Sequence, residues 1–423
     1  MLSKRIENLR QVYNDFPRQF WVLVGARFID QVGGYMVFPF LTLYITEKFG
    51  VGMTEVGAVF GLVALTSVIG NILGGALTDR FGRKKLVIYG LIVSALLNVV
   101  IGFANAMWQI YFLAAFFGFL GNLAGPAHGA MVADMLPEEK RAQGYGIMRV
   151  TFNLAVVIGP AIGGILATTS YLLLFIGDAI SSTITAAIVA VAIQETKPEK
   201  AEGEPEETMA QSMGGYLDVV RDVAFVLFVL ASMLLSFVYM QLNTTLGVYL
   251  RDTHGIIEQY FGYMLSLNAL MVVLFQFPIT RRIARYKPML MMALGTLLYA
   301  IGFGMYGFVS TLPLFVAAVA ILTIGEMIVA PNAQALVAKF APEHMRGRYM
   351  AFSGFSGMIP MMFGPLLSGA ILDNADPRML WYIVGVVGLV AAAAFVGLDR
   401  RVDQPEDETG HVAETAEQAP ATA

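Results

Sequence analysis

The chain has 423 residues, of which 57% are hydrophobic and 14% are charged, with a formal net charge of -4 at pH 7. This composition lies far outside that of a soluble domain and predicts an all-α membrane protein made of spanning helices of roughly 20 residues each. A soluble catalytic domain has no room in it, and we expect no nucleic-acid partner. The chain contains no cysteine, which excludes disulfides, thiolate metal sites and cysteine nucleophiles.

In chain order, residues 1–18 are polar and mixed in charge, and a long apolar run without a small-residue cleavage site follows them. This start predicts a cytoplasmic lead rather than a signal peptide. Apolar runs between breaking residues then predict twelve spanning helices. They cover Phe20–Ile45, Val56–Thr78, Leu86–Ala106, Gln109–Met135, Tyr145–Thr169, Tyr171–Ile193, Phe225–Leu250, Gln259–Thr280, Pro288–Val309, Pro313–Phe340, Tyr349–Leu372 and Leu380–Leu398.

Basic residues alternate between the connections of these helices. One set of connections holds clusters such as Arg80–Lys85 and Arg281–Lys287, whereas the opposite set holds only Lys48, Arg251 and Arg378. Short basic connections stay on the cytoplasmic side, and a miscounted helix would exchange the two sets for the rest of the chain. The pattern therefore predicts a multi-pass protein of the cell membrane with both termini cytoplasmic.

The two halves of the chain are repeats of each other at an offset of 205 residues. Without any gap, this offset superimposes residues typical of turns and helix contacts, such as Tyr44 on Tyr249, Gly50 on Gly255, Gly57 on Gly262, Pro160 on Pro365 and Gly164 on Gly369. We therefore predict six-helix bundles over residues 1–194 and 216–401. The charged, proline-bearing residues 195–215 are expected to form a cytoplasmic linker, and residues 402–423 a disordered acidic tail.

The most charged short turn lies between the second and third predicted helices, in the sequence Gly75-Ala-Leu-Thr-Asp-Arg-Phe-Gly-Arg-Lys84. This pattern, G-x-L-x-D-R-x-G-R-K, resembles the signature between helices 2 and 3 of major facilitator superfamily (MFS) transporters. The resemblance implies the MFS fold, in which two six-helix halves rock around a binding site near the membrane midplane. The duplication of the chain supports this resemblance independently of the signature.

The resemblance also implies roles for the charged residues of the signature. In the family, the aspartate faces the start of helix 11 and the second arginine pairs with an acid at the cytoplasmic end of helix 4, which together help to latch the outward-facing state. The matching residues are Asp79 and Arg83, with Asp134 as the acid. The second half has Ala284 in place of the aspartate, so we expect a one-sided latch. Its residues are Gly75, Asp79, Arg80, Gly82, Arg83 and Asp134.

The fifth predicted helix contains Gly159, Pro160, Gly163 and Gly164, which resemble the G-P-x-x-G-G motif of the antiporter branches of the family. The glycine that leads this motif is Ala155 here, so the match is incomplete. Glycines along one face allow close helix packing, and proline bends a span. Because Gly364, Pro365 and Gly369 repeat the pattern in the eleventh helix, we favour a structural role, and the motif adds only modest support for export.

Acidic residues inside the spans are the main functional signal, because each is costly at the bilayer centre and normally faces a cavity or a partner. Asp30 and Glu326 lie near mid-span, and the repeat places Leu235 and Gly121 at the matching positions, so the shared fold requires neither acid. Burial favours the neutral form of a carboxyl group and a nearby cation favours the charged form, so either acid can exchange a proton for substrate. Asp178 is a third candidate, with capping or packing as its alternative role.

Asp30 also has an alternative role, because Arg27 lies three residues away on the same helix face and can neutralise it. A substrate cavity needs apolar walls with a few polar groups that orient the ligand. The candidates for these polar groups are Gln31, Asn153, Tyr239, Gln241, Asn243 and Asn268. The chain also has 24 methionines, which suit a permissive site and equally suit ordinary helix packing.

No phosphate-binding loop, metal-ligand cluster or nucleophile elbow is present in the sequence, so we expect neither an enzyme nor a resident cofactor or metal. We predict a secondary transporter that exports amphipathic, drug-like molecules in exchange for protons and works as a monomer. Its partners would be a small-molecule substrate, protons and the lipid bilayer. A proton-linked symporter for a small polar metabolite is the alternative. A receptor or scaffold on the same fold would leave the buried acids unexplained.

Overall fold

The computed structural model describes residues 13–197, 219–342 and 345–402. The first half contains α2 (Arg18–Val37), η1 (Phe38–Phe40), α3 (Leu41–Phe49), α4 (Met53–Phe81), α5 (Arg83–Phe103), α6 (Met107–Phe116), η2 (Phe117–Gly121), α7 (Gly125–Met135), α8 (Glu138–Ala167) and α9 (Tyr171–Ala192). The second half contains α11 (Val223–Thr244), α12 (Leu246–His254), α13 (Glu258–Ile283), α14 (Pro288–Met305), α15 (Leu312–Phe340), α16 (Arg346–Ser353), α17 (Phe355–Asn374) and α18 (Pro377–Val402).

These elements form 12 stretches that are long and apolar enough to cross a membrane, within the described residues. The count confirms the twelve predicted helices. The predicted tail, and most of the predicted linker, lie outside the described residues. The described part of the linker, Glu195 to Lys197, contacts the start of α5: the Glu195 carboxylate accepts a hydrogen bond from the backbone N–H of Arg83 at 2.8 Å.

Four predicted spans, the first, fourth, seventh and eleventh, are interrupted where the sequence pattern suggested continuous helices. The first passes through η1 between α2 and α3, and the eleventh breaks at Gly354 between α16 and α17. The seventh ends at Thr244, and the chain restarts as α12 after Thr245. The fourth contains the π-helical turn η2, where Gly118 lies against the backbone of Val63 on α4. Glycine allows that approach because a Cβ atom would overlap the neighbouring helix. Apolar content alone does not reveal such breaks.

The predicted repeat is visible in the hydrogen bonding of the two halves. Tyr44 and Tyr249, which are 205 residues apart, each donate from the hydroxyl to the backbone carbonyl of the residue 57 positions later, at 2.6 and 2.8 Å. Gly50 and Gly255 end the helices α3 and α12 with left-handed φ angles of 62° and 64°. Equivalent residues therefore make equivalent structures in both bundles.

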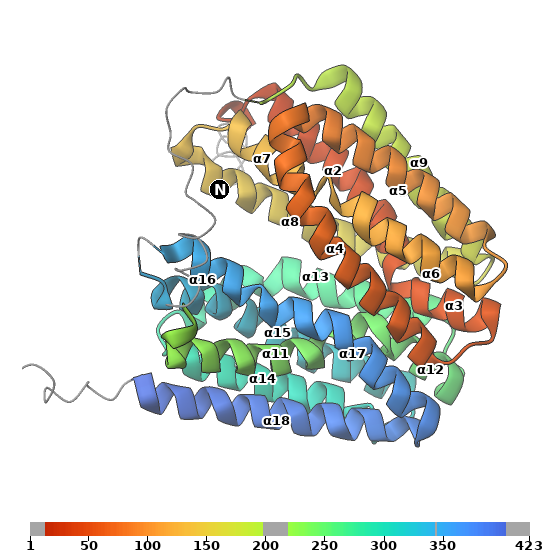
Figure 1. Cartoon of the computed structure of the whole chain (residues 1–423). Helices are drawn as coiled ribbons and strands as arrows, with labels where there is room; N and C mark the ends of the chain where they lie inside the picture. The colour runs from red at the N-terminus through yellow and green to blue at the C-terminus, as the bar shows by residue number, and fades with distance from the viewer. Residues whose placement is uncertain (1–12, 198–218, 343–344, 403–423) are drawn as a thin grey trace, which may run out of the picture.

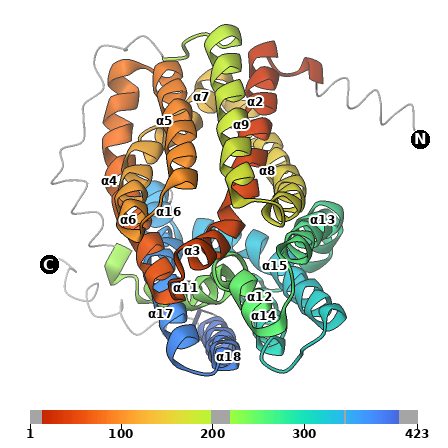
Figure 2. The ribbon, with the colours of Figure 1, turned by 90° about the vertical axis from the view of Figure 1, so that its right-hand side faces the viewer.

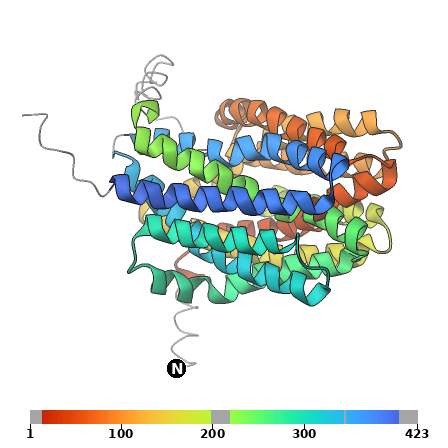
Figure 3. The same cartoon turned by 90° about the horizontal axis from the view of Figure 1, so that it is seen from below.

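The two bundles are arranged as a wedge. They meet at the end that holds α3 and α12, and they diverge toward the end that holds α7 and α16 (Figure 1). Figure 2 looks onto the end where they meet, with α3 and α12 facing the viewer between the bundles. From below, α18 crosses the middle of the face formed by the second half (Figure 3). We call the two ends of the molecule the closed end and the open end.

Glycines bring helices of different halves together at the closed end. A Cβ atom on Gly57 of α4 would overlap the backbone of Leu366 on α17, and one on Gly262 of α13 would overlap the carbonyl of Pro160 on α8. Gly57 and Gly262 are equivalent positions of the repeat. The pairs α4·α17 and α8·α13 are thus two copies of one contact, related by the pseudo-symmetry of the chain.

Candidate functional site

The first candidate site surrounds Glu326, on α15. Its carboxylate accepts hydrogen bonds from the hydroxyl of Tyr239 at 2.9 Å and from the side-chain amide of Asn268 at 2.8 Å. Asn268 also donates to Thr323 at 2.9 Å, and the ring of Tyr239 stacks on that of Tyr299 with centroids 5.5 Å apart. These contacts hold the carboxylate in one orientation, and no ion pair to it is found among the described side chains.

Glu326 lies between two cavities of about 230 and 370 Å³, both of which it lines together with Tyr239. The smaller one receives Tyr35 and Asn153 from the first half as well as residues of the second half. The larger one extends toward Gly357, Pro360 and Met361 of the second half. An acidic group therefore lies where the two halves of the molecule face each other.

The structure brings together four of the six predicted cavity residues, namely Asn153, Tyr239, Asn243 and Asn268, around the smaller of these two cavities. It separates the other two from them. Gln31 lines a different cavity. Gln241 is fully buried: it donates to the carbonyl of Phe237 and accepts from the hydroxyl of Thr245. Its polar groups are satisfied inside the half, so it packs rather than lines a cavity.

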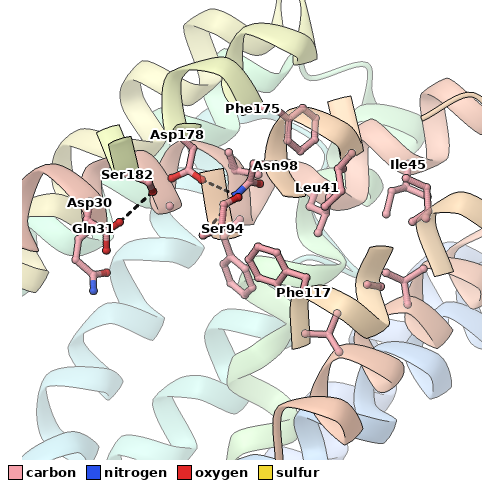
Figure 4. A pocket seen from close by; sticks show the side chains of 18 residues that line it. Asp30, Gln31, Leu41, Ile45, Ser94, Asn98, Phe117, Phe175, Asp178 and Ser182 are labelled. Carbon is pink, nitrogen blue, oxygen red and sulfur yellow. Dashed lines mark hydrogen bonds between the residues drawn. The ribbon is translucent and has the colours of Figure 1, made fainter. Parts of the chain in front are cut away.

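The second candidate site is a third cavity, of about 220 Å³, which lies inside the first half and is lined by both Asp30 and Asp178 (Figure 4). The amide of Asn98 donates to Asp178 at 2.7 Å, and the hydroxyl of Ser182 donates to Asp30 at 3.1 Å. The rest of the wall is mostly apolar and includes Phe38, Leu41, Ile45, Val59, Phe117 and Phe175. This cavity has an acidic polar end and an apolar body.

The predicted pairing of Asp30 with Arg27 is present, at 3.5 Å. Asp178 is 4% exposed, and its bond to Asn98 shows that it lies in the bundle interior and does not cap α9, whose N-cap is Ser170. Asn98, Ser182 and Tyr35 also line these cavities and were not predicted from the sequence. Of these, Asn98 was the easiest to predict from the sequence, because a lone amide in an apolar span carries the same signal as a lone acid.

The glycine and proline motif of the fifth predicted span, which is α8 in the structure, packs against two helices. Gly159 and Gly163 face the backbone of α2, whereas Gly164 faces the backbone of Glu258 and Gln259 at the start of α13. Pro160 lines the cavity beside Glu326. The structural role of these residues is close packing. Whether the motif favours exchange stays a prediction.

At the open end, Arg83 Nε lies 2.9 Å from Asp134 Oδ2, so the contact implied by the signature is present. Gly82 has a φ angle of 95°, a conformation that suits glycine, where α4 turns into α5. Arg80 lies in the last turn of α4, and no atom lies within 4 Å of a Cβ built on Gly75. The side chain of Asp79 lies outside the described part of the structure, and the latch role of these residues stays a prediction.

No group of three or more His, Cys, Asp or Glu side chains that could hold a metal ion is found in the described ranges. Glu326 is the one acid of its site, and Asp30 and Asp178 share the other. Their partners are hydroxyl and amide groups, and Asp30 also pairs with Arg27. Such an arrangement suits proton exchange, or binding of a cation by a carboxylate.

The sequence matches the profile of the Major Facilitator Superfamily over residues 23–257 and 242–421. The chain belongs to the major facilitator superfamily. Its fold is also that of solved transporters. A nucleoside transporter, NupG, superimposes with a TM-score of 0.73 at 15% identity, over 91% of this chain and all of that chain. A POT family transporter gives a TM-score of 0.75 at 15% identity, over 92% and 99%.

Relatives of this MFS transporter by sequence include proteins with different named activities. A "Na(+), Li(+), K(+)/H(+) antiporter" of Planococcus maritimus is 30% identical over 379 residues, which are 83% of this chain and 89% of the relative. An uncharacterized MFS-type transporter of Bacillus subtilis, YttB, is 27% identical over 92% of this chain and 98% of its own. The multidrug resistance protein MdtH of Shigella boydii is 25% identical over 85% and 88%.

Proposed function

We propose that this MFS transporter exports amphipathic small molecules in exchange for protons. The observation that carries the proposal is Glu326, a carboxylate with neutral hydrogen-bond donors alone among the described side chains, on the wall of a cavity lined by both halves. A membrane protein rarely retains such a group without a role in ion or substrate passage. The multidrug relative supports this substrate class, and transport rather than catalysis fits the family.

The orientation follows from charge. We propose that the open end faces the cytoplasm, because Arg83, Lys84 and Lys85 begin α5 there and short basic connections are retained on that side. Both termini are then cytoplasmic, and the protein lies in the cell membrane. The wedge is an inward-facing state, in which the cavities at Glu326 receive substrate from the cytoplasm.

The proposed exchange uses the chemistry of one carboxyl group. A protonated Glu326 is neutral, and a substrate with a positive group favours its charged form, so the proton leaves when the substrate enters. Tyr239 and Asn268 donate to the same carboxylate and hold it in place while its charge changes. When the halves rock, the other side of the membrane supplies a proton that releases the substrate.

Asp30 is a second proton-coupling group in this proposal, with Asp178 beside it in the first-half cavity. Arg27 lies 3.5 Å from Asp30. When Asp30 loses its proton, it therefore forms an ion pair with Arg27 instead of becoming an isolated charge. Asp178 has its amide partner and no ion pair among the described residues, so it is the acid of this cavity that is free to meet a cation.

A second candidate function is exchange of alkali cations for protons. Two observations favour it: the 30% identity to a named Na⁺, Li⁺, K⁺/H⁺ antiporter, and the first-half cavity, in which carboxylate, hydroxyl and amide oxygens lie together. Oxygen ligands of this kind suit hard cations. The two functions do not exclude each other, because the two sites are separate.

The test uses purified protein in proteoliposomes with an imposed pH gradient and a fluorescent cationic dye as substrate. We expect dye exchange in the wild type, and a loss of roughly tenfold or more in Glu326→Gln and in Asp30→Asn, because neither variant releases a proton at that position. Glu138→Gln, which changes an exposed acid at the start of α8, is the matched control and should keep full activity. Gradient-driven dye flux that survives both substitutions would rule out the proposed coupling.

The same vesicles separate the candidate functions. If Na⁺, Li⁺ or K⁺ dissipates the pH gradient and the dye does not, cation exchange is the function. In cells, collapse of the pH gradient should raise dye accumulation for an exporter, whereas a symporter for a polar metabolite would accumulate less substrate.

A further inference from the structure

Asp373, in the last turn of α17, contacts the other half of the molecule at the closed end. Its Oδ1 accepts the backbone N–H of Met53 at 2.8 Å, and its Oδ2 accepts the backbone N–H of Thr54 at 2.7 Å and the Thr54 hydroxyl at 2.6 Å. The first N–H groups of a helix have no partner within the helix. The N-cap of α4 is Gly52, which offers no side chain, so a carboxylate from the opposite half caps α4.

The shared fold does not require this cap. The residue that matches Asp373 at the 205-residue offset is Thr168, whose hydroxyl donates to the carbonyl of Ile165 in its own helix at 2.7 Å. The start of α13, which matches the start of α4, has Ile257 at its N-cap and no side-chain cap. The glycine packing is duplicated at α4·α17 and α8·α13, whereas the acidic cap is present at one of them.

Within the described residues, the three bonds of this cap are also the shortest polar contacts between the halves at this end, and the bond from the Tyr171 hydroxyl to Glu258 is longer, at 3.1 Å. Arg251 of α12 reaches the carbonyl of Leu43 at 3.1 Å and the hydroxyl of Thr46 at 2.9 Å. Its ion pair with Glu47, at 3.4 Å, is longer than each of the three Asp373 bonds. Asp373 instead makes three short bonds, and a carboxylate at a helix N-terminus also gains from the helix dipole.

We propose that Asp373 is a positioning residue that latches the closed end of the transporter. Asp373 is not among the residues that line the cavities described above. It holds α4 against α17 while the open end is apart, and its three bonds must break when the halves rock to open the closed end. Asp373 is exposed, so water can replace α4 as its partner and the contact is reversible. The inference rests on alternating access in the family and on no particular substrate.

Helix α4 gives this latch its geometry. Its N-terminus meets Asp373, and its opposite end carries Asp79. That opposite end lies apart from α16 in the present state (Figure 1). The helix pair α4·α17 therefore has an acidic residue near each end, and rocking of the halves brings one end together as it separates the other.

The absence of cysteine in the chain makes a direct test simple. Spin labels on Asn105→Cys and Ser310→Cys, exposed residues at equivalent positions of the two halves, report the separation of the closed ends by pulsed electron paramagnetic resonance. We expect Asp373→Ala to raise the ratio of long to short distances by roughly tenfold, as lost charge-assisted bonds imply. Thr54→Val, which removes one of the three bonds, should shift the ratio less in the same direction.

The matched control is Asp376→Ala. Asp376 is an exposed acid in the connection that follows α17, and it accepts the backbone N–H of Arg378 at 2.9 Å within its own half. Its loss should leave the distances unchanged. Two results would overturn the inference: unchanged distances in folded Asp373→Ala protein, or an equal shift in Asp376→Ala. If Asp373→Ala does not fold, unchanged distances in Thr54→Val would overturn it. Failure of the proposed coupling has a different signature, because Glu326→Gln would then transport normally whatever the distances show.

Discussion

Glu195 shows how a single residue at the open end escapes sequence analysis. It lies just after α9, at the start of the predicted linker, yet it accepts the backbone N–H groups of Arg83 at 2.8 Å and of Lys197 at 3.1 Å. Burial opposes the charged form, but these backbone hydrogen bonds outweigh it and lower the pKa of Glu195. Its partner Arg83 is 112 residues away, so composition marks Glu195 only as a charge in a polar segment.

Glu195→Gln should loosen the turn between α4 and α5. A lowered pKa means that Glu195 stabilises the fold at neutral pH, and that this contribution is lost as the pH falls through its folded-state pKa, below the ordinary value of 4.5. Hydrogen exchange of a peptide covering residues 80–90 should therefore be faster in the variant at pH 7. The difference from the wild type should shrink in acid. Equal hydrogen exchange of the two proteins at pH 7 would show that the hydrogen bonds of Glu195 do not stabilise this turn.

The sequence identified the acids Asp30, Asp178 and Glu326 but not how they are grouped in space. The sequence identified all three as costly acids in apolar helices. It did not show that Asp30 and Asp178 share one cavity while Glu326 lines others. That grouping depends on which helix faces point inward, and apolar spans in a membrane carry little periodicity to indicate it.

At the scale of elements, helix contacts at the closed end depend on glycine. A Cβ atom on Gly57 would overlap backbone atoms of Leu366 and Pro365, which cannot move as a flexible side chain can. Gly57→Ala should thus separate α4 from α17 and destabilise the protein by about 1–3 kcal/mol, as overpacking does. Thermal unfolding in detergent measures the effect.

The control for this substitution is Gly397→Ala, in α18, where no atom lies within 4 Å of the added Cβ. Alanine is the better helix former by about 1 kcal/mol, so this variant should be as stable as the wild type or slightly more so. A Gly57→Ala protein that matches Gly397→Ala in melting temperature would show that the contact adapts without cost.

The whole molecule must alternate between two arrangements if it transports. Thr54→Cys combined with Asp373→Cys places two thiols where the native side chains are 2.6 Å apart. Oxidation should join α4 to α17 and abolish transport, and a reductant should restore it. Each single-cysteine variant, oxidised in the same way, is the control. Transport by the fully cross-linked protein would show that the closed end need not open.

The amino-acid sequence by itself determined the membrane class, the twelve helices, the duplication and the family. Each of these depends on local or repeated properties: apolar runs of spanning length, alternating basic turns, and residues that recur at one offset. The tertiary structure alone decided that the two halves meet at one end, that Glu326 lies between them, and that Asp373 caps α4. These features are contacts between helices that are far apart in the sequence, up to 320 positions for Asp373 and Met53. Apolar spans of similar composition do not encode in any visible pattern which helix faces which.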